Sequence, residues 1–466
     1  MKQSDIFLKK NKREASRGFT LIEALMFLFL FSVITLSFYQ TWILATGHIV
    51  NVKSRLGAIA VANQQMEIIR SIIFDDIGTT TGIPVGTLAE NQTLSVNNAV
   101  FNVHTLVQFV DNPTDGTLGA GTDIAPNDYK QVTITVSWGG GTDAEKISTT
   151  SIFSLDGVES VAAGTGILSV NVLDGTGAGV SGASVHIVNS SVAPAVNITA
   201  STDTNGNLTF PGAPASVQGY QISVSKSGYY PNTTYPPYPT STFNPVNIHT
   251  TVVAGSLTAT TLVSDADSDI SFRTQDPFGT DVADVDFEIT GGLVIGNEIS
   301  DASPVYDYTQ SLTTNGSGEE NITNRSAGVY TVVLDASETT YRFLRLSPEE
   351  VDFGTINLSA GTNKSVTMVL ADKSFSSALI TAVNSADNQP IAGASIRLTN
   401  VGIGYDTTVT TDTYGQAFFH TANTPLVAGT YDVEITAASY VTKTGTIDIA
   451  GDKLEEKQFA LVFIPG

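Results

Sequence analysis

The chain of 466 residues contains no cysteine. This absence excludes disulfide bonds, thiolate metal sites and cysteine nucleophiles, so packing and hydrogen bonds must stabilise the fold. Basic residues are also scarce, because 22 Lys and Arg stand against 45 Asp and Glu, which gives a formal net charge of -23. An acidic surface repels phosphate backbones, so we expect no nucleic-acid partner.

The sequence signatures of catalysis are missing as well. No HxxE or HExxH spacing would place two ligands on one metal, and the histidines lie far apart, at His48, His104, His186, His249 and His420. There is no GxSxG elbow, no P-loop and no GxGxxG after a strand. We therefore expect a protein that is not an enzyme and that needs no cofactor.

What the sequence does contain is one long apolar run near its N-terminus. Residues 19–44 carry a single side chain that is charged at neutral pH, Glu23, and about 20 apolar residues suffice to cross a bilayer. The run is too long for a secretory signal, and no small-residue cleavage site ends it. Basic residues that precede it predict a cytoplasmic N-terminus and an extracytoplasmic body on a single membrane pass: Lys2, Lys9, Lys10, Lys12, Arg13 and Arg17.

The start of the run carries a specific motif. Residues 17–26 read RGFTLIEALM, which closely resembles the processing site of type IV prepilins and of type II secretion pseudopilins. The resemblance implies a leader, residues 1–18, that a prepilin peptidase removes after Gly18. It also implies N-methylation of the new terminal residue, Phe19.

The carboxylate of Glu23 has a physical explanation in this setting. A charge inside hydrocarbon costs about 2.5–3.5 kcal/mol on insertion scales, so an intramembrane carboxylate needs a partner. Cleavage after Gly18 creates an ammonium group on Phe19 in the same region of the bilayer, and opposite charges are buried at lower cost together than apart. In pilins this pair is thought to align an incoming subunit with its neighbour, so Glu23 is predicted to act in assembly. The alternative is a carboxylate that snorkels to the interface.

A small domain follows the membrane segment, and we place it at residues 45–160. Apolar residues recur at helical spacing as far as Ile73, which predicts one long helix that breaks near residues 75–78. Short alternating strands then follow, including residues 100–110 and 131–138. A helix followed by a small sheet resembles the plan of minor pilins.

Two groups of aspartates leave a calcium site open. Hard cations bind carboxylate oxygens, but Asp is also an ordinary residue of tight turns, and the spacing is not that of an EF-hand. The turn interpretation is favoured for both groups, which are Asp111, Asp115 and Asp123, and Asp265, Asp267 and Asp269.

The rest of the chain is repetitive. Residues 166–189 and 377–400 share a pattern that contains GlyAlaSer, and each is followed by a ThrAspxxGly turn and a segment with Tyr. A divergent copy lies between them. Alternating strands and Gly/Asp/Asn turns predict three β-sandwiches, at residues 164–255, 256–372 and 373–466. The predicted fold is thus a pilin-like helix with a small antiparallel sheet, followed by three all-β sandwich domains.

The turns of the repeats are predicted to be structural. Gly206 and Gly415 supply a positive φ, while Asp203 and Asp412 hydrogen-bond the turn backbone. In the divergent copy, Asn315 replaces the aspartate and Asp284 replaces a glycine. The pattern resembles the carboxypeptidase-regulatory-like domain, which has a transthyretin-like, immunoglobulin-type fold.

Two further features have competing interpretations. An intramolecular Lys–Asn isopeptide bond, as in some collagen-adhesin B-type sandwiches, has three candidate lysines: Lys226, Lys364 and Lys443. They do not fall at one register of the repeat, so the interpretation as ordinary solvated lysines is favoured. The Pro/Tyr-rich residues 229–242 are a stiff connector or an aromatic ligand-binding loop, and the connector is favoured.

These observations predict a minor type IV pilin at the tip of a fibre or as a sparse decoration of it. Its partners would be prepilin peptidase, other pilin subunits with the pilus assembly machinery, the cytoplasmic (inner) membrane before assembly, and an unidentified surface ligand of the modules. Two alternatives stay open. One is a type II secretion pseudopilin, and the other is a membrane-anchored carbohydrate-binding or accessory protein that does not polymerise.

Overall fold

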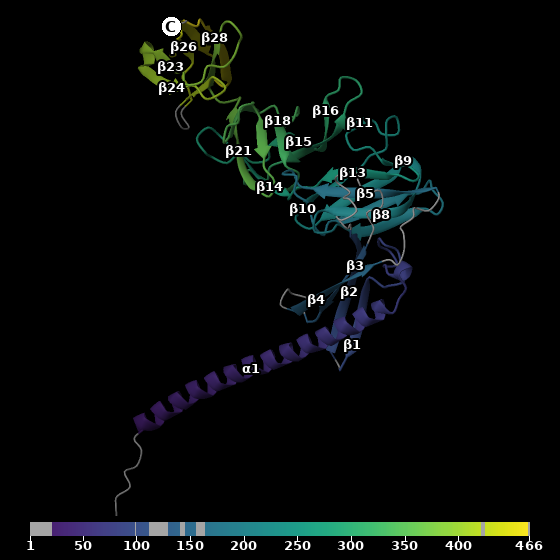
Figure 1. The fold of residues 1–466 in the computed structure, drawn as a ribbon. Coiled ribbons are helices and arrows are strands. Elements are labelled where there is room, and N and C mark those ends of the chain that lie inside the picture. The colour runs from purple at the N-terminus through teal and green to yellow at the C-terminus, as the bar shows by residue number, and fades with distance from the viewer. Residues whose placement is uncertain are drawn as a thin grey trace, which may run out of the picture. The chain divides into compact units, whose positions relative to one another are not determined.

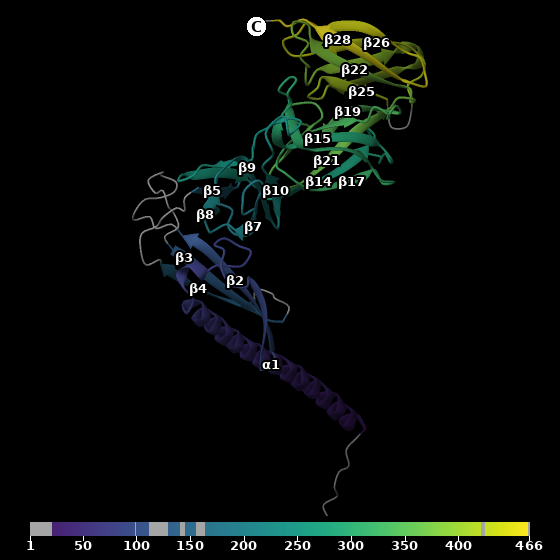
Figure 2. The ribbon, with the colours of Figure 1, turned by 90° about the vertical axis from the view of Figure 1, so that its right-hand side faces the viewer.

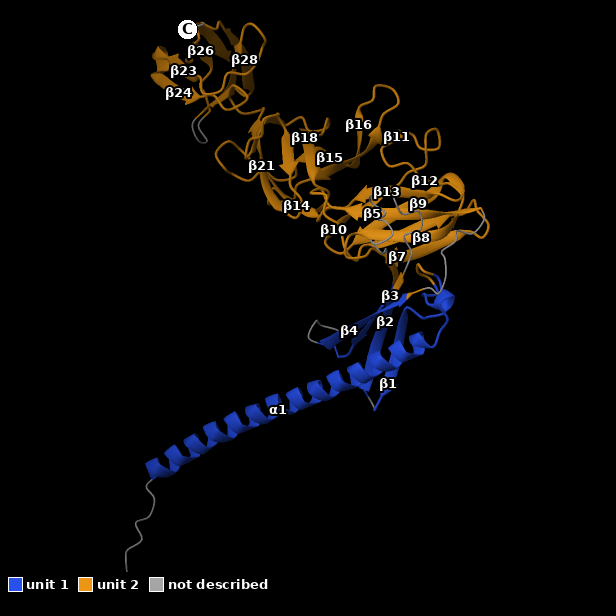
Figure 3. Ribbon diagram, in the orientation of Figure 1, with its two compact units in different colours: residues 1–80, 85–107, 131–153 blue, residues 81–84, 108–130, 154–466 orange. Residues whose placement is uncertain are grey.

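A computed structural model describes residues 21–97, 99–110, 129–139, 145–154, 164–420 and 425–464 (Figure 1). The chain divides into two compact units, which Figure 3 colours separately. Unit 1 consists of residues 1–80, 85–107 and 131–153, and unit 2 consists of residues 81–84, 108–130 and 154–466. Each unit is described by itself.

Unit 1 is built on one long helix, α1 (Leu21–Arg70). The helix ends before Ile73, where the apolar pattern had predicted it to continue. Ser71 ends it, because the Ser71 main-chain N–H and side-chain hydroxyl both donate to the carbonyl of Ile68, at 3.0 and 2.6 Å. A short 3-10 helix at Phe74–Asp76 follows.

The C-terminal part of α1 packs on an antiparallel sheet with the strand order β1-β2-β3-β4 (Figure 2). Its strands are β1 (Asn91–Val96), β2 (Ala99–Val110), β3 (Tyr129–Ser137) and β4 (Lys146–Ser154). Gly57 permits the close approach of helix and sheet, since a Cβ there would lie 2.8 Å from the ring tip of Phe101. The core contains Ala58, Val61, Ala62, Met66 and Ile69 from the helix and Phe101, Val103, Val107, Val132, Ile134, Val136 and Trp138 from the sheet.

Unit 2 contains three β-sandwiches, as the repeats predicted. The first module pairs a sheet of order β13-β5-β8 with a sheet of order β10-β9-β6-β7, to which β12 adds on β9. Its strands are β5 (Thr165–Leu173), β6 (Ser184–Asn189), β7 (Val196–Ser201), β8 (Asn207–Pro214), β9 (Ser216–Lys226), β10 (Tyr229–Thr233), β12 (Thr250–Val252) and β13 (Leu257–Val263). The predicted boundary after residue 255 is therefore too early, because β13 pairs with β5 of the first module.

The second module has sheets of order β17-β14-β21-β19 and β11-β15-β18-β20, and β16 pairs with β15. The strands are β11 (Asn244–Pro245), β14 (Ser268–Gln275), β15 (Asp286–Asn297), β16 (Pro304–Thr313), β17 (Glu319–Arg325), β18 (Gly328–Leu334), β19 (Tyr341–Ser347), β20 (Thr355–Leu358) and β21 (Asn363–Asp372). Two stacked rings, Phe272 and Phe287, lie in its core with centroids 4.4 Å apart.

The third module has sheets of order β25-β22-β28 and β24-β23-β26-β27. The strands are β22 (Ser377–Asn384), β23 (Ser395–Asn400), β24 (Tyr405–Thr410), β25 (Gln416–Phe419), β26 (Gly429–Thr436), β27 (Lys443–Ile449) and β28 (Leu454–Leu461). Each module thus encloses its own apolar core between two sheets. The predicted class, a long helix with a small antiparallel sheet followed by three all-β sandwiches, is confirmed.

Candidate functional site

The N-terminal part of α1 is exposed along its length, and near its end Asn51 accepts a hydrogen bond from the indole N–H of Trp138 at 3.3 Å. Every residue from Leu21 to Lys53 is exposed, and Figure 1 shows this part of the helix extending past the sheet. The helix is long and apolar enough to cross a membrane. The apolar part of α1 therefore offers its whole circumference to a surrounding phase or to partners.

The hydroxyl groups of this apolar segment are satisfied within the helix. Each of them donates to a carbonyl four residues earlier at 2.7–2.9 Å: Ser32, Thr35, Ser37, Thr41 and Thr46. An unsatisfied polar group in hydrocarbon costs several kcal/mol, so these back-bonds fit the segment to an apolar phase. Tyr39 and Trp42 lie near the far end of the segment, where aromatic rings mark a membrane interface.

Exposed apolar side chains recur on α1 over more than the thickness of a bilayer, and past Gly47 they alternate with polar ones such as Asn51, Lys53 and Arg55. At about 1.5 Å per residue, the helix from Leu21 to Leu56 is about 54 Å long, whereas the hydrocarbon core is about 30 Å thick. To place all of it in hydrocarbon the helix would have to tilt by about 56°, beyond the range of about 0–40° that membrane helices adopt. Apolar residues past Trp42 are exposed by 51–67%: Ile43, Leu44, Ile49, Val50, Val52 and Leu56.

Of the predicted processing and assembly residues, the structure describes one. Glu23 lies in the first turn of α1, where a carboxylate interacts favourably with the helix dipole. Gly18 and Phe19, and with them the cleavage and methylation positions, lie outside the described residues. The proposed pair between Glu23 and a terminal ammonium therefore stays a prediction.

The second group of aspartates hydrogen-bonds to main chain. Asp265 accepts the N–H of Gly175 at 2.5 Å, and Asp269 accepts the N–H of Asn324 at 3.0 Å. Among the described residues, no three His, Cys, Asp or Glu side chains gather as a metal site would require. The first group, Asp111, Asp115 and Asp123, lies outside them.

The histidines lie apart from one another and make separate contacts. His104 and His186 each bond an asparagine on a neighbouring strand, at 3.1 and 2.8 Å. His249 bonds the hydroxyl of Thr234 at 2.9 Å, and burial lowers its pKa. His420 packs against Phe278, Phe375 and Phe418 with ring centroids 4.4–5.0 Å away, and His48 is exposed on α1.

Only one of the three candidate lysines lies beside both an acid and an asparagine. Lys364 pairs with Glu350, which also accepts the amide of Asn357 at 2.8 Å. The hydrogen bonds from Lys364 and Asn357 lower the pKa of Glu350, which makes the contact an ordinary ion pair. Lys226 lies over the Tyr229 ring, 4.3 Å from its centroid, and Lys443 is exposed. This geometry supports the interpretation as ordinary lysines.

The predicted turns have the expected geometry. The Asp203 carboxylate accepts the N–H groups of Asn205 and Asn207, both at 2.8 Å. Asp412 accepts those of Tyr414 and Gln416, at 3.0 and 2.8 Å. Positive φ angles occur at the predicted glycines, +81° at Gly206 and +71° at Gly415, and at Asp284 of the second module, +56°. These predictions are confirmed.

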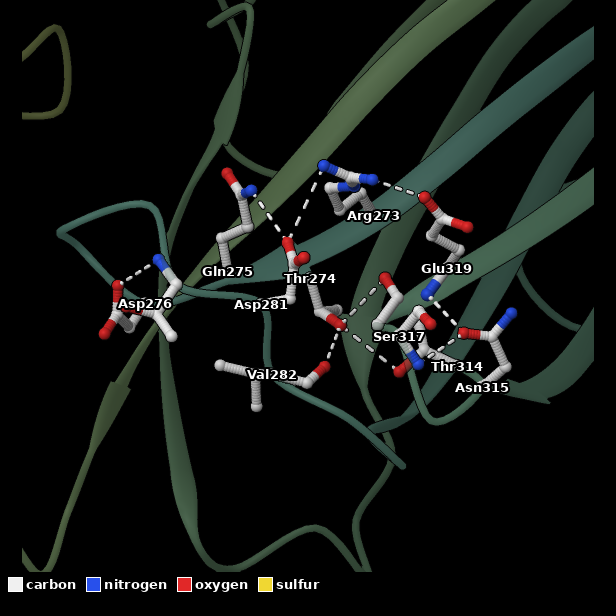
Figure 4. A network of polar contacts seen from close by, with 12 residues as sticks. Arg273, Thr274, Gln275, Asp276, Asp281, Val282, Thr314, Asn315, Ser317 and Glu319 are labelled. Atoms are coloured by element: carbon white, nitrogen blue, oxygen red, sulfur yellow. Dashed lines mark hydrogen bonds and ion pairs between the residues drawn. The ribbon is translucent and has the colours of Figure 1, made fainter.

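A buried threonine precedes each of these turns and joins neighbouring loops. The hydroxyls of Thr202 and Thr411 each donate to a carbonyl and accept a main-chain N–H. In the second module, Thr314 accepts the N–H of Val285 at 3.1 Å and lies 3.2 Å from the hydroxyl of Thr274 (Figure 4). Asn315 bonds the turn in place of the aspartate.

Each module also has a buried tyrosine whose hydroxyl reaches a nearby carbonyl. Tyr220, Tyr330 and Tyr431 are fully buried, and they donate to Pro214, Ser326 and Val427 at 2.7, 2.7 and 2.9 Å. This arrangement is the tyrosine corner of immunoglobulin-type sandwiches. Burial raises the pKa of Tyr220 and of Tyr330 to about 12, so both phenols stay donors at neutral pH.

Residues 229–233 of the Pro/Tyr-rich stretch form β10 of the first module, and the chain returns to that module at β12 after the stretch ends. Tyr230 donates its N–H to Asp265, and Tyr235 packs edge-on against Phe243 with centroids 5.5 Å apart. The next residues form β11, which pairs with β15 of the second module. The stretch thus links strands of the first module and also contacts the second, so it is not a simple connector between the two modules.

One half-buried acid, Asp307, was not predicted. Burial raises the pKa of Asp307 on β16, although a hydrogen bond from Tyr230 and the nearby Arg325 act in the opposite direction. Its Oδ1 is buried without a hydrogen-bond partner. The residues that bury it come from distant strands, so no local sequence signal could have found it.

No protein-family model matches the chain, and no curated protein does. Among solved structures, the Bacillus anthracis TIE protein is 13% identical over 80% of this chain and 73% of its own, with a TM-score of 0.20. A streptococcal ancillary pilin is 13% identical over 64% and 99%, with a TM-score of 0.19. GBS52, the minor pilin of Streptococcus agalactiae, is 12% identical over 43% and 97%, with a TM-score of 0.18. At such TM-scores the matches carry no argument about function.

Proposed function

We propose that the protein is a minor type IV pilin, a fibre component that carries three β-sandwich modules. The first support is the motif at residues 18–23, which resembles the processing site of type IV prepilins. On this proposal, prepilin peptidase cleaves after Gly18, Phe19 is methylated, and the precursor crosses the cytoplasmic membrane once with its body outside.

The observation that carries the proposal is the length of the exposed apolar surface on α1. A monomeric anchor needs only the part that lies in the bilayer, about 20 residues. The apolar side chains from Ile43 to Leu56 extend past that length and stay 51–67% exposed, although Asn51 in this stretch accepts a hydrogen bond from Trp138. A large exposed apolar surface indicates a protein partner. Helices of neighbouring pilin subunits would cover this surface along its whole length.

The modules would be the exposed, functional part of the subunit. They add about 300 residues to a small pilin domain, and such bulk would crowd neighbours along a packed fibre. A place at the tip, or as a sparse decoration, therefore fits better than the place of a major subunit. The proposed role is adhesion or binding at the cell surface, and the resemblance of the modules to carboxypeptidase-regulatory-like domains stays a prediction.

The proposal is tested by separating processing from assembly. Glu23→Val removes the predicted partner of the Phe19 ammonium but eases insertion into the membrane. The variant should be cleaved normally and accumulate in the membrane, yet be depleted from sheared fibres on a quantitative blot. Glu23→Asp, which keeps the charge with a shorter reach, should be incorporated in part.

Glu67→Val is the matched control. Glu67 lies on the same helix, is exposed and pairs with Arg70, outside the apolar segment. This variant should enter fibres as the wild type does. Wild-type amounts of Glu23→Val in the sheared fraction would overturn the assembly role of Glu23. Retention of the wild-type protein in the membrane after shearing would favour the non-polymerising anchor, and absence from surface fibres on immunogold labelling would favour a pseudopilin.

A further inference from the structure

The three modules close one of their sheets in the same way. The first strand of each module pairs in parallel with its last strand: β5 with β13, β14 with β21, and β22 with β28. In the second module, the far edge of the last strand is covered, because β19 pairs antiparallel with β21. That edge therefore accepts an antiparallel strand in this fold.

In the first and third modules, the corresponding edge has no paired strand among the residues that the structure describes. The two edges differ in charge. Strand β28 carries Glu455, Glu456 and Lys457, and charged residues are a usual protection of edge strands against pairing. Strand β13 reads LTATTLV, without charge and without proline. It is the unprotected edge of the two.

The main chain of β13 is available for pairing. Bonds at its two ends, from Ile167 N–H to Ser256 and from Ser264 N–H to Leu173, show that the even-numbered residues bond to β5. The odd-numbered residues therefore direct their N–H and C=O groups to the free edge. One of these carbonyls, that of Val263 at the end of the strand, accepts the side chain of Asn232 at 2.8 Å. Ala259 and Thr261, in the middle of the strand, are exposed.

We propose that this edge pairs antiparallel with β13 of a second copy of the chain. With Thr260 opposite Thr260 of the second copy, all seven residues overlap. Ala259 then lies opposite Thr261, so residues with free N–H and C=O groups face one another and exchange hydrogen bonds. Thr258 lies opposite Leu262, so the core-facing side chains of the two strands lie on the same face of the joined sheet.

The charge distribution allows this pairing in spite of the acidic chain. Residues 246–264 contain one ionisable side chain, that of His249. In the register about Thr260, Asp265 of one copy lies opposite Gly255 of the other, so the acidic residues that follow β13 do not meet. The apolar side chain at the end of the strand, that of Val263, is 41% exposed and lies opposite Leu257 in this register, so it gains cover. The proposal goes beyond the pilin function, because it concerns contacts between the sandwiches and not the helix.

The test uses the absence of cysteine, which makes any introduced thiol unique. Directly opposed residues without shared hydrogen bonds have Cα atoms about 4.5 Å apart in antiparallel pairs, within the range of about 4.4–6.8 Å for a disulfide. The full-length Thr260→Cys chain, oxidised in detergent-solubilised membranes, should form a disulfide-linked dimer. Thr408→Cys is the matched control on β24, an edge strand of the third module; Thr408 is exposed, so random collisions would cross-link it at least as readily.

A second change should abolish the dimer. Thr261→Lys places a charge on the outward face of β13 without removing a bond to β5, so Thr260→Cys combined with Thr261→Lys should stay monomeric with its modules still resistant to protease. Ala259→Cys, treated with a bismaleimide that spans about 8 Å, should give a cross-linked dimer through the outward face of the paired strands, which tests the pairing independently. Cross-linking no greater than at residue 408, a dimer that persists with Thr261→Lys, or a cross-link to a different protein would each overturn the proposal.

Discussion

Replacement of the corner tyrosines by phenylalanine should destabilise the second module more than the third. Tyr330→Phe and Tyr431→Phe remove the same hydroxyl from fully buried rings. The residues whose carbonyls lose the donor differ in exposure: Ser326 is 5% exposed, whereas Val427 is 56% exposed. We therefore expect water to replace the hydroxyl more readily at Val427 than at Ser326.

The magnitudes follow from this difference. A hydrogen bond exchanged for water contributes about 0.5–1.5 kcal/mol, and a buried group left unsatisfied costs about 1–3 kcal/mol. We therefore expect about 1–3 kcal/mol for Tyr330→Phe and about 0.5–1.5 kcal/mol for Tyr431→Phe. Since a tenfold change in an equilibrium constant corresponds to about 1.4 kcal/mol, the equilibrium constants for opening of the two modules should rise about 5- to 150-fold and about 2- to 13-fold.

Hydrogen exchange followed by mass spectrometry measures each module separately, which a single melting curve of a multidomain chain does not. Peptides from β18 should exchange faster in Tyr330→Phe, and peptides from β26 should do so in Tyr431→Phe. Peptides from the unchanged first module are the internal control. Equal effects of the two substitutions, or a larger effect in the third module, would refute the argument from water access.

Three further predictions concern single positions. Gly393 has a φ of +71°, and a Cβ there would meet no other atom. Gly393→Ala should therefore lower the stability by about 1–2 kcal/mol through backbone strain alone. Gly393→Asp should lower it less, because Asp284 adopts a similar φ of +56° in the second module, and thermal melts of both variants would compare the two. Burial raises the folded pKa of Asp307 above the ordinary value of 3.8. The stability that its protonation contributes is therefore present below pH 3.8 and is lost as the pH rises through the folded pKa. Asp307→Asn should stabilise the second module at pH 7 and not at pH 3, and an equal gain at both pH values would contradict this. A bulky residue at Gly18 should leave residues 1–18 attached, as intact-mass measurement would show, whereas a mature chain that starts at Phe19 would contradict the proposed processing.

Local signals predicted much of this structure. The turns at Asp203 and Asp412 were predictable because each carboxylate bonds N–H groups within four residues of itself. The strands were predictable because one face of each sheet is buried, which imposes alternation on the sequence. The register of the repeat aligned Asp284 with a glycine, and the structure shows that this residue has a positive φ.

Features that depend on distant segments were missed. Strand β13 resembles any other alternating strand, and its partner β5 lies some 90 residues upstream, so the sequence placed the module boundary before it. Asp307 reads as an exposed strand residue until β15, β18 and the segment at Tyr230 cover it. The end of α1 was misplaced because Ser71 ends the helix without a glycine or proline to mark the position.

The parallel pairing of first and last strands determines how the modules respond to force. A pull along the chain acts on the start of β22 and on the end of β28, which lie at opposite ends of a ladder that runs from Ser377 paired with Leu454 to Asn384 paired with Leu461. The load is therefore a shear that all rungs of the ladder carry together, and the strands cannot separate one bond at a time. The first and second modules have the same geometry through β5 with β13 and β14 with β21. A chain without a single disulfide thus has three mechanical clamps in series, each made of main-chain hydrogen bonds that can form again once the pull ends.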